Sequence, residues 1–134
     1  MTKSGSLPKL ESGQALAEFA VALPIVLIMI FVTIEFCGAI YAYTVIADAT
    51  SVGIHYAVVH GSDTGGTVAR VKSVASYTFH DVSKIAISVT YPDGTAIPPA
   101  RVAISVSYQY VPWLGNFMEH PPTIRAFAEG RLVR

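Results

Sequence analysis

One long apolar run dominates the hydrophobic pattern of this chain. Residues 19–34 are sixteen consecutive positions without an ionisable side chain, and Thr33 carries the only hydroxyl group among them. Extended through Glu35 to Ile40, the run exceeds the roughly 20 residues that a helix needs to cross about 30 Å of hydrocarbon. The pattern therefore predicts a membrane-spanning helix over residues 14–40.

Polar residues recur at helical spacing beyond Ile40, which indicates a single helix from about Gln14 to Val59 that continues outside the membrane. The polar stripe consists of Thr44, Asp48, Ser51 and His55. A neighbouring apolar stripe consists of Val45, Ala49, Val52, Tyr56 and Val59. Because the polar stripe is narrow, we expect the chain's own domain to cover one side of this helix and a partner subunit another. Repeated turn residues over 60–66 then end the helix.

The rest of the chain carries shorter patterns. Apolar residues at helical spacing predict a second helix over about Thr67–Phe79. Alternating apolar and polar residues predict strands over Ile85–Tyr91 and Val102–Tyr110, and a third candidate strand runs from about Thr123 to Val133. We therefore predict an α+β fold, in which an antiparallel sheet of about three strands packs on the emergent half of the long helix.

The composition is poor in charge. Charged residues make up 13% of the chain, and its formal net charge is zero without a basic cluster, so we expect no nucleic-acid partner. The first thirteen residues are net positive, with Lys3 and Lys9 against Glu11, which favours a cytoplasmic N-terminus and export of the remainder. We expect three parts: a leader over 1–13, a transmembrane helix over 14–40 and an exported domain over 41–134.

A glutamate just before the apolar run is the main clue to function. A cut between Gly13 and Gln14 would create a new amine four residues before Glu18, about one helical turn away. Gly13, Gln14, Glu18, Phe19 and the apolar run resemble the processing site of type IV pilin-like proteins. Together with "YAYTVIADATSVGIHYAVVHG", they are similar to the TadE-type pseudopilins of the tight-adherence (Tad) secretion system.

The resemblance implies that a prepilin peptidase cuts after Gly13 on the cytoplasmic side of the bacterial inner membrane. Glu18 would then serve membrane extraction and subunit register. The freed amine of Gln14 has a reference pKa of about 7.7–8.0, so in its charged form it could offset the Glu18 carboxylate of a neighbouring subunit. The alternative is that Glu18 lies solvated at headgroup level and pairs with nothing.

The resemblance also implies a place in a larger assembly. The chain would be a minor subunit that primes or caps a pilus used for adhesion or secretion, and it would meet an inner-membrane assembly platform, lipid and other pilin subunits. We expect Pro24 to bend the helix. We expect subunit packing on the helix face that includes Gly38, Ala49 and Gly53.

Other chemistry is weakly indicated. The four histidines, His55, His60, His80 and His120, lie in no recognised ligand spacing, so we expect no metal, no cofactor and no enzymatic activity. Trp113, Tyr108, Tyr110 and Phe117 form an aromatic group that we expect to be core or loop anchoring. The main alternative function is an uncleaved single-pass membrane protein whose exported domain binds a partner or the cell wall. A membrane-tethered enzyme is a third hypothesis for the function.

Overall fold

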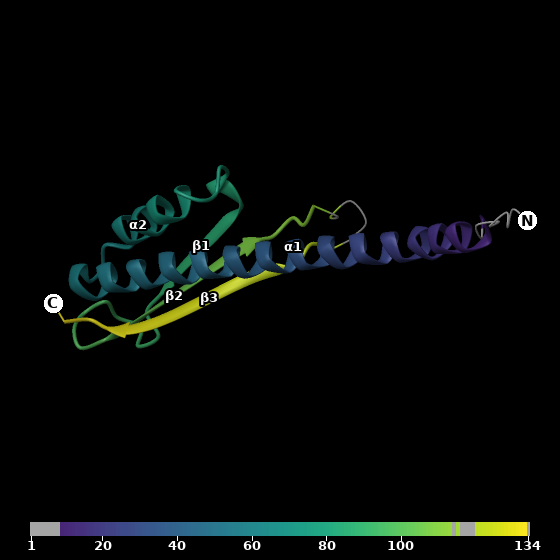
Figure 1. Cartoon of the computed structure of the whole chain (residues 1–134). Helices are drawn as coiled ribbons and strands as arrows, with labels where there is room; N and C mark the ends of the chain where they lie inside the picture. Colours follow the sequence, from purple (N-terminus) through teal and green to yellow (C-terminus); the bar gives the residue numbers. More distant parts are fainter. Residues whose placement is uncertain (1–8, 114, 116–119, 134) are drawn as a thin grey trace, which may run out of the picture. The chain divides into compact units, whose positions relative to one another are not determined.

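The computed structural model describes residues 9–113, 115 and 120–133, with side chains described from Gly13 onward. Contacts divide the chain into two compact units whose boundary falls between Phe36 and Cys37. The α+β prediction is confirmed. In chain order the elements are α1 (Lys9–His60), α2 (Thr64–Ser76), the short 3-10 helix η1 (Val82–Lys84), β1 (Ile85–Thr90), β2 (Arg101–Gln109) and β3 (Thr123–Arg131) (Figure 1).

The N-terminal unit contains the first part of α1. Every side chain over residues 13–34 is exposed, although nearly all of them are apolar. The helix is long and apolar enough to cross a membrane, with a mean hydropathy of 2.6 over its most apolar window. It continues through Pro24 as one helix. In water this surface would be strongly unfavourable, so an apolar environment or other protein surfaces must cover it.

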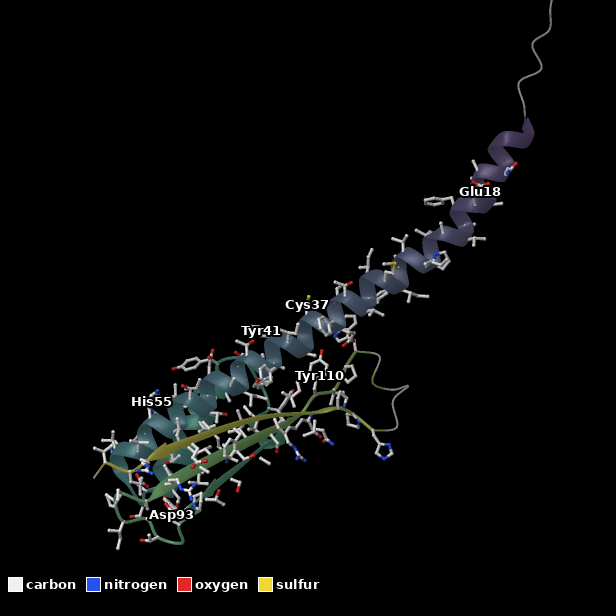
Figure 2. All side chains as sticks on the ribbon, turned by 90° about the horizontal axis from the view of Figure 1, so that it is seen from below. Glu18, Cys37, Tyr41, His55, Asp93 and Tyr110 are labelled. Carbon is white, nitrogen blue, oxygen red and sulfur yellow. The ribbon has the colours of Figure 1, made fainter. Side chains whose placement is uncertain are left out.

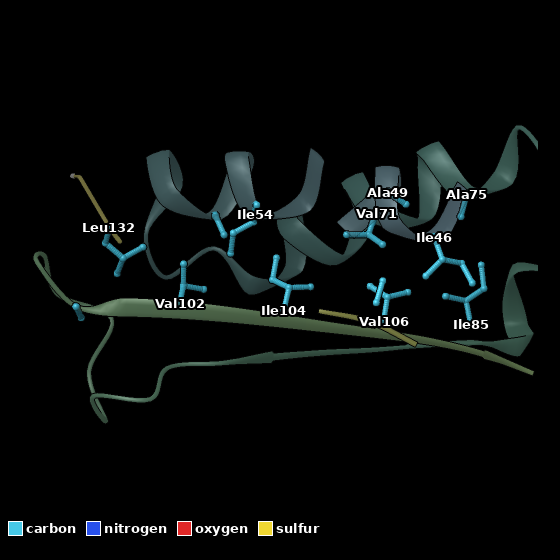
Figure 3. Close-up of a cluster of buried hydrophobic side chains, with 13 residues drawn as sticks. Ile46, Ala49, Ile54, Val71, Ala75, Ile85, Val102, Ile104, Val106 and Leu132 are labelled. Carbon is cyan, nitrogen blue, oxygen red and sulfur yellow. The ribbon is translucent and has the colours of Figure 1, made fainter. Parts of the chain in front are cut away.

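The second unit is a sheet with helices on one face. Its strands lie in the order β1-β2-β3 and are antiparallel, with Val106 of β2 opposite Ile87 of β1 and Ala126 of β3. The later turns of α1, together with α2, cover one face (Figures 1 and 3). The most completely buried large side chains between the layers are Ile46, Val71, Val102, Ile104 and Val106. The predicted packing of the sheet on the emergent half of the helix is therefore confirmed.

The buried face of α1 differs from the predicted apolar stripe. The predicted polar stripe is exposed, but so are Val52 and Val59 from the apolar one. The residues of α1 that the domain buries are Ala42, Ile46, Ala49, Thr50, Gly53, Ile54 and Ala57. Most of these are small, so the sheet and α2 approach the helix closely. The hydroxyl of the buried Thr50 donates to the carbonyl oxygen of Ile46 at 2.6 Å, so this buried polar group has a hydrogen-bond partner.

The second helix begins and ends three residues earlier than predicted. Asp63 caps it, because its Oδ1 accepts a hydrogen bond from the Gly66 N–H at 2.9 Å. Thr64, Gly65 and Gly66, which the sequence pattern assigned to a turn, therefore form the first turn of this helix. The chain reverses instead at Gly61, whose φ is +58°. Phe79 lies beyond the helix, and its ring packs on Tyr108 with ring centroids 4.4 Å apart.

The ends of the strands are tied to the rest of the domain. The turn before β2 is closed by a hydrogen bond from the Gly94 N–H to the Tyr91 carbonyl oxygen at 3.0 Å. At the start of β2, the Arg101 guanidinium contacts Asp93 at 2.8 Å and Glu129 at 3.3 Å. After β3, the Val133 N–H donates to the Val58 carbonyl oxygen of α1 at 3.1 Å. The last strand is therefore fixed to the helix that underlies it.

Candidate processing and assembly segment

The predicted processing residues lie on two successive turns of α1. The side-chain amide of Gln14 donates to Glu18 Oε1 at 3.2 Å, which is the one-turn spacing expected from the sequence (Figure 2). Phe19 beside Glu18 is 63% exposed. A methyl group added at Gly13 would meet no atom within 4 Å. The segment therefore presents a small residue, a carboxylate and an apolar ring on an open surface.

Glu18 is electrostatically isolated along this part of the sequence. It is the only ionisable residue over 14–34. Apolar side chains at Val21 and Ile25 follow it along the helix and are exposed. An ion in such surroundings costs several kcal/mol once water is removed, unless a charged or hydrogen-bonding partner accompanies it. Gln14 supplies a neutral donor, so a cationic partner for Glu18 must come from beyond this stretch.

The start of α1 was not foreseen from the sequence. The helix begins at Lys9, so the peptide bond between Gly13 and Gln14 lies inside it, and the leader does not end where the helix starts. The first N–H groups of a helix have no intrahelical acceptor, and its first turns open at low cost. A protease that cuts at this bond must therefore unwind the first turns of α1. Ser12 and Gly13 directly before the bond, both weak helix formers, favour that opening.

The residues predicted to pack against other subunits lie in contact with the chain's own domain. A methyl group at Gly38 would come within 2.6 Å of the Tyr110 hydroxyl oxygen. Ala49 is fully buried, and Gly53 lies against side chains of α2 and β2. In the single chain these positions are covered, and their contact with another subunit stays a prediction, as does the bend at Pro24.

The aromatic group predicted to be core is divided. Tyr108 is partly buried against Phe79, and burial, with a smaller contribution from Asp81, raises the pKa of its phenol. A place in the core is wrong for Trp113, whose side chain is 93% exposed. A turn closed by the hydrogen bond from the Gly115 N–H to the Pro112 carbonyl oxygen at 2.8 Å buries the proline instead of the indole. Phe117 lies outside the described residues.

A polar corner between α1 and α2 was not expected from the sequence. The Tyr56 hydroxyl donates to Asp63 Oδ2 at 2.9 Å, and its ring stacks on His60 with centroids 3.9 Å apart. The hydrogen bond from the Gly66 N–H, followed by that from Tyr56, lowers the pKa of the Asp63 carboxyl group. Asp63 before Thr-Gly-Gly is the signal that could have revealed the cap. The corner holds two helices together and is structural.

Among the described residues, the histidines do not form a metal-binding group. His55, His80 and His120 are exposed, and His60 stacks on Tyr56. Over the part of the chain that the structure describes, no three His, Cys, Asp or Glu side chains gather in a group that could hold a metal ion. The absence of a metal and a cofactor stays a prediction.

Comparison with known protein families matches the segment that carries these features. The family model of TadE-like proteins matches residues 13–54. Residues 13–54 of the chain are similar to this family. The match begins at Gly13, includes Glu18 and extends along α1 to Ile54, and it confirms the resemblance seen in the sequence. No curated protein and no solved structure gives a significant match.

The TadE-like segment indicates a general role for the chain. Similarity to the TadE-like family over residues 13–54 suggests a minor pilin-like protein that is associated with a Tad pilus and interacts with other pilus components. The single candidate membrane span among the described residues fits a membrane-anchored component of such a system.

Proposed function

We propose that this protein is a minor pilin that a prepilin peptidase cuts between Gly13 and Gln14. The mature chain, held in the bacterial inner membrane with its C-terminal domain exported, then joins or primes a Tad pilus for adhesion or secretion. One observation carries the proposal. The TadE-like segment places Glu18, the only ionisable residue over 14–34, one turn after the proposed cut on an exposed apolar helix.

The chemistry of assembly follows from this geometry. Cleavage converts the backbone nitrogen of Gln14 into an amine, which near neutral pH is mostly protonated. The Gln14 side chain of the same chain contacts Glu18 Oε1 at 3.2 Å, which leaves Oε2 as the acceptor for the amine of a neighbouring subunit. In an apolar assembly an unpaired carboxylate costs several kcal/mol. The pair would therefore fix the axial offset between two subunits.

The replacement Glu18→Ala tests this role. We expect the variant to insert into membranes like the wild type, because the change removes a charge beside an apolar helix. We expect its recovery in sheared fibres to be abolished. Asp48→Ala is the control, since Asp48 is an exposed carboxylate on the same helix outside the apolar run. Immunoblots of membranes and sheared fibres, from cells with a Tad system, measure both steps. Normal recovery of Glu18→Ala in fibres would end the proposal.

One observation favours the second candidate, an uncleaved single-pass protein whose exported domain binds a partner or the cell wall. Gly13 lies inside α1 and not in an extended leader, and a helical bond resists proteolysis until it unwinds. This candidate requires the leader on the mature protein. For both candidates we propose a structural or binding role without enzymatic activity.

A further inference from the structure

The loop that follows β2 presents apolar side chains to solvent. Val111 is 57% exposed and Trp113 is 93% exposed, and no charged residue occurs over 109–115. Large exposed apolar side chains near one another indicate a surface that is covered in the working protein. Tryptophan in particular carries an apolar ring and one N–H donor, which suits a boundary between an apolar phase and water.

The contact between Tyr110 and Gly38 fixes this loop beside one level of α1. The Tyr110 hydroxyl oxygen lies so close to Gly38 that a methyl group there would approach it to 2.6 Å. The Tyr110 N–H also donates to the Pro122 carbonyl oxygen at 3.1 Å, which ties both ends of the loop together. Val111 and Trp113 therefore leave the domain next to the turn of α1 that carries Gly38.

That turn is where the hydrocarbon of a bilayer would end. Counting from the residue after Glu18, residues 19–38 number 20, the length that crosses about 30 Å of hydrocarbon. Tyr41 and Tyr43 follow, and they are 60% and 52% exposed. At 1.5 Å per residue they lie about 4.5 and 7.5 Å beyond Gly38 along the helix. The headgroup layer on one side of a bilayer is about 5–8 Å thick, and tyrosine and tryptophan are enriched there.

The opposite end of the sheet has the reverse character. Asp93, Arg101 and Glu129 form their ion-pair network where β2 begins, whereas the exposed apolar side chains of Val111 and Trp113 follow where β2 ends. Figure 2 shows Asp93 and Tyr110 at the two ends of the sheet. The ion pairs therefore lie at one end of the sheet, and Val111 and Trp113 lie at the end beside Gly38.

We propose that Val111 and Trp113, with Tyr41 and Tyr43, lie in the headgroup layer of the membrane and hold the exported domain against the bilayer before assembly. The partner is the lipid interface itself. This inference rests on the membrane placement within the proposed function. It adds a second membrane contact, made by a loop about 75 residues after Gly38 in the sequence, so extraction of a subunit must release the loop as well as the helix.

Trp113 is the only tryptophan of the chain, so its fluorescence reports this site alone. The experiment uses the full chain in vesicles of phosphatidylcholine and phosphatidylglycerol at a high ratio of lipid to protein. Quenching by brominated lipid measures contact with the bilayer, and quenching by acrylamide measures contact with water. The matched control combines Trp113→Phe with Ile97→Trp, because Ile97 is 73% exposed in the loop at the charged end of the sheet.

We expect Trp113 to be quenched several-fold more by brominated lipid, and several-fold less by acrylamide, than the tryptophan of the control. Equal quenching of the two proteins by both agents would overturn the inference while leaving the membrane helix in place. Shielding of Trp113 from both agents would also overturn it, because a second protein copy would then be the cover. Loss of the chain from the vesicles on an alkaline carbonate wash would instead contradict the membrane placement on which the proposed function depends.

Discussion

The two units of this protein use the same apolar residue types in opposite ways. Ile28 and Met29 in the N-terminal unit are 62% and 66% exposed, whereas Ile46 and Ile104 in the second unit are fully buried. Burying such a side chain contributes about 1.5–3 kcal/mol. The domain therefore obtains this energy from its own chain. The N-terminal helix obtains it only from lipid or from other subunits, which is the property that a membrane-stored subunit of a fibre requires.

The comparison also holds within the single helix α1. Its first half is apolar on all sides, which is the pattern of a helix surrounded by an apolar environment. Its later turns carry an exposed polar stripe and a buried face of small residues. The two halves therefore face different surroundings. Val52 and Val59, which are apolar and exposed, could contact a partner subunit in the proposed assembly.

The largest expected effect contrasts a buried with an exposed isoleucine. Ile104→Ala should lower the free energy of unfolding of the domain by about 2–5 kcal/mol, because it leaves a cavity under α1. Ile28→Ala should change it by about 0.5 kcal/mol or less. Chemical denaturation of both variants in detergent micelles, followed by circular dichroism, measures the difference. Similar losses for the two variants would show that the units do not differ in this way.

A smaller effect is expected at Gly38, where the domain contacts α1. Gly38→Ala should cost about 1–3 kcal/mol, because the new methyl group crowds the Tyr110 hydroxyl. With Tyr110→Phe the nearest remaining ring atom is 3.7 Å away, so the cost should disappear. A double-mutant cycle on the free energy of unfolding measures this coupling. Additive effects of the two changes would mean that Gly38 serves another contact, such as one with a neighbouring subunit.

The smallest effect concerns the dependence of stability on pH. The folded-state pKa of Asp63 lies below its ordinary value of 3.8. Its contribution to stability is therefore fully present above that value and is lost as the pH falls through the lower folded-state pKa. Asp63→Asn keeps an oxygen for the Gly66 N–H but does not titrate. We expect it to be less stable than the wild type at neutral pH, where the charged carboxylate contributes, and to approach the wild type in acid.

The difference in stability between the variant and the wild type should narrow in the acid range. Asp81 and Asp93 also have lowered pKa values, because they accept hydrogen bonds from Ser83 and Arg101 respectively. Asp63→Asn should therefore lose stability less steeply than the wild type on acidification, without becoming independent of pH. Thermal unfolding midpoints recorded from neutral to strongly acidic pH test this. An unchanged acid slope would mean that Asp63 contributes nothing through its charge.

The sequence predicts the elements of the domain well because their signals are local. The alternation in Ile85–Tyr91 and Val102–Tyr110 reflects one buried and one exposed face, and β1 and β2 follow it to within one residue at each end. The face of α1 that is buried was harder to predict, since Val45 and Ile46 are both apolar. Only the approach of the sheet and α2 selects Ile46 for the core.

The spacing of the candidate site residues along the helix could be predicted from the sequence, but the contacts that the domain makes near them could not. The one-turn relation of Gln14 to Glu18 follows from helix geometry alone, and the structure has it. The contact of Gly38 with Tyr110 joins positions 72 residues apart, so no local sequence pattern predicts it. The outward position of Trp113 depends on the turn at Pro112 and Gly115. Hydrophobicity by itself would have placed the indole in the core.

We propose that the chain is cut beside Glu18 so that its exposed helix can enter an assembly. The intact mass of the protein from membranes, in cells with and without a prepilin peptidase, tests it most directly. We expect a chain that starts at Gln14 in the first cells and at Met1 in the second. Gly13→Val should keep the leader in both, because the structure has open space at this position and the fold is not disturbed. Ala20→Val, at another exposed position, should be cut normally. A wild-type chain that still starts at Met1 in cells with an active peptidase would contradict the account.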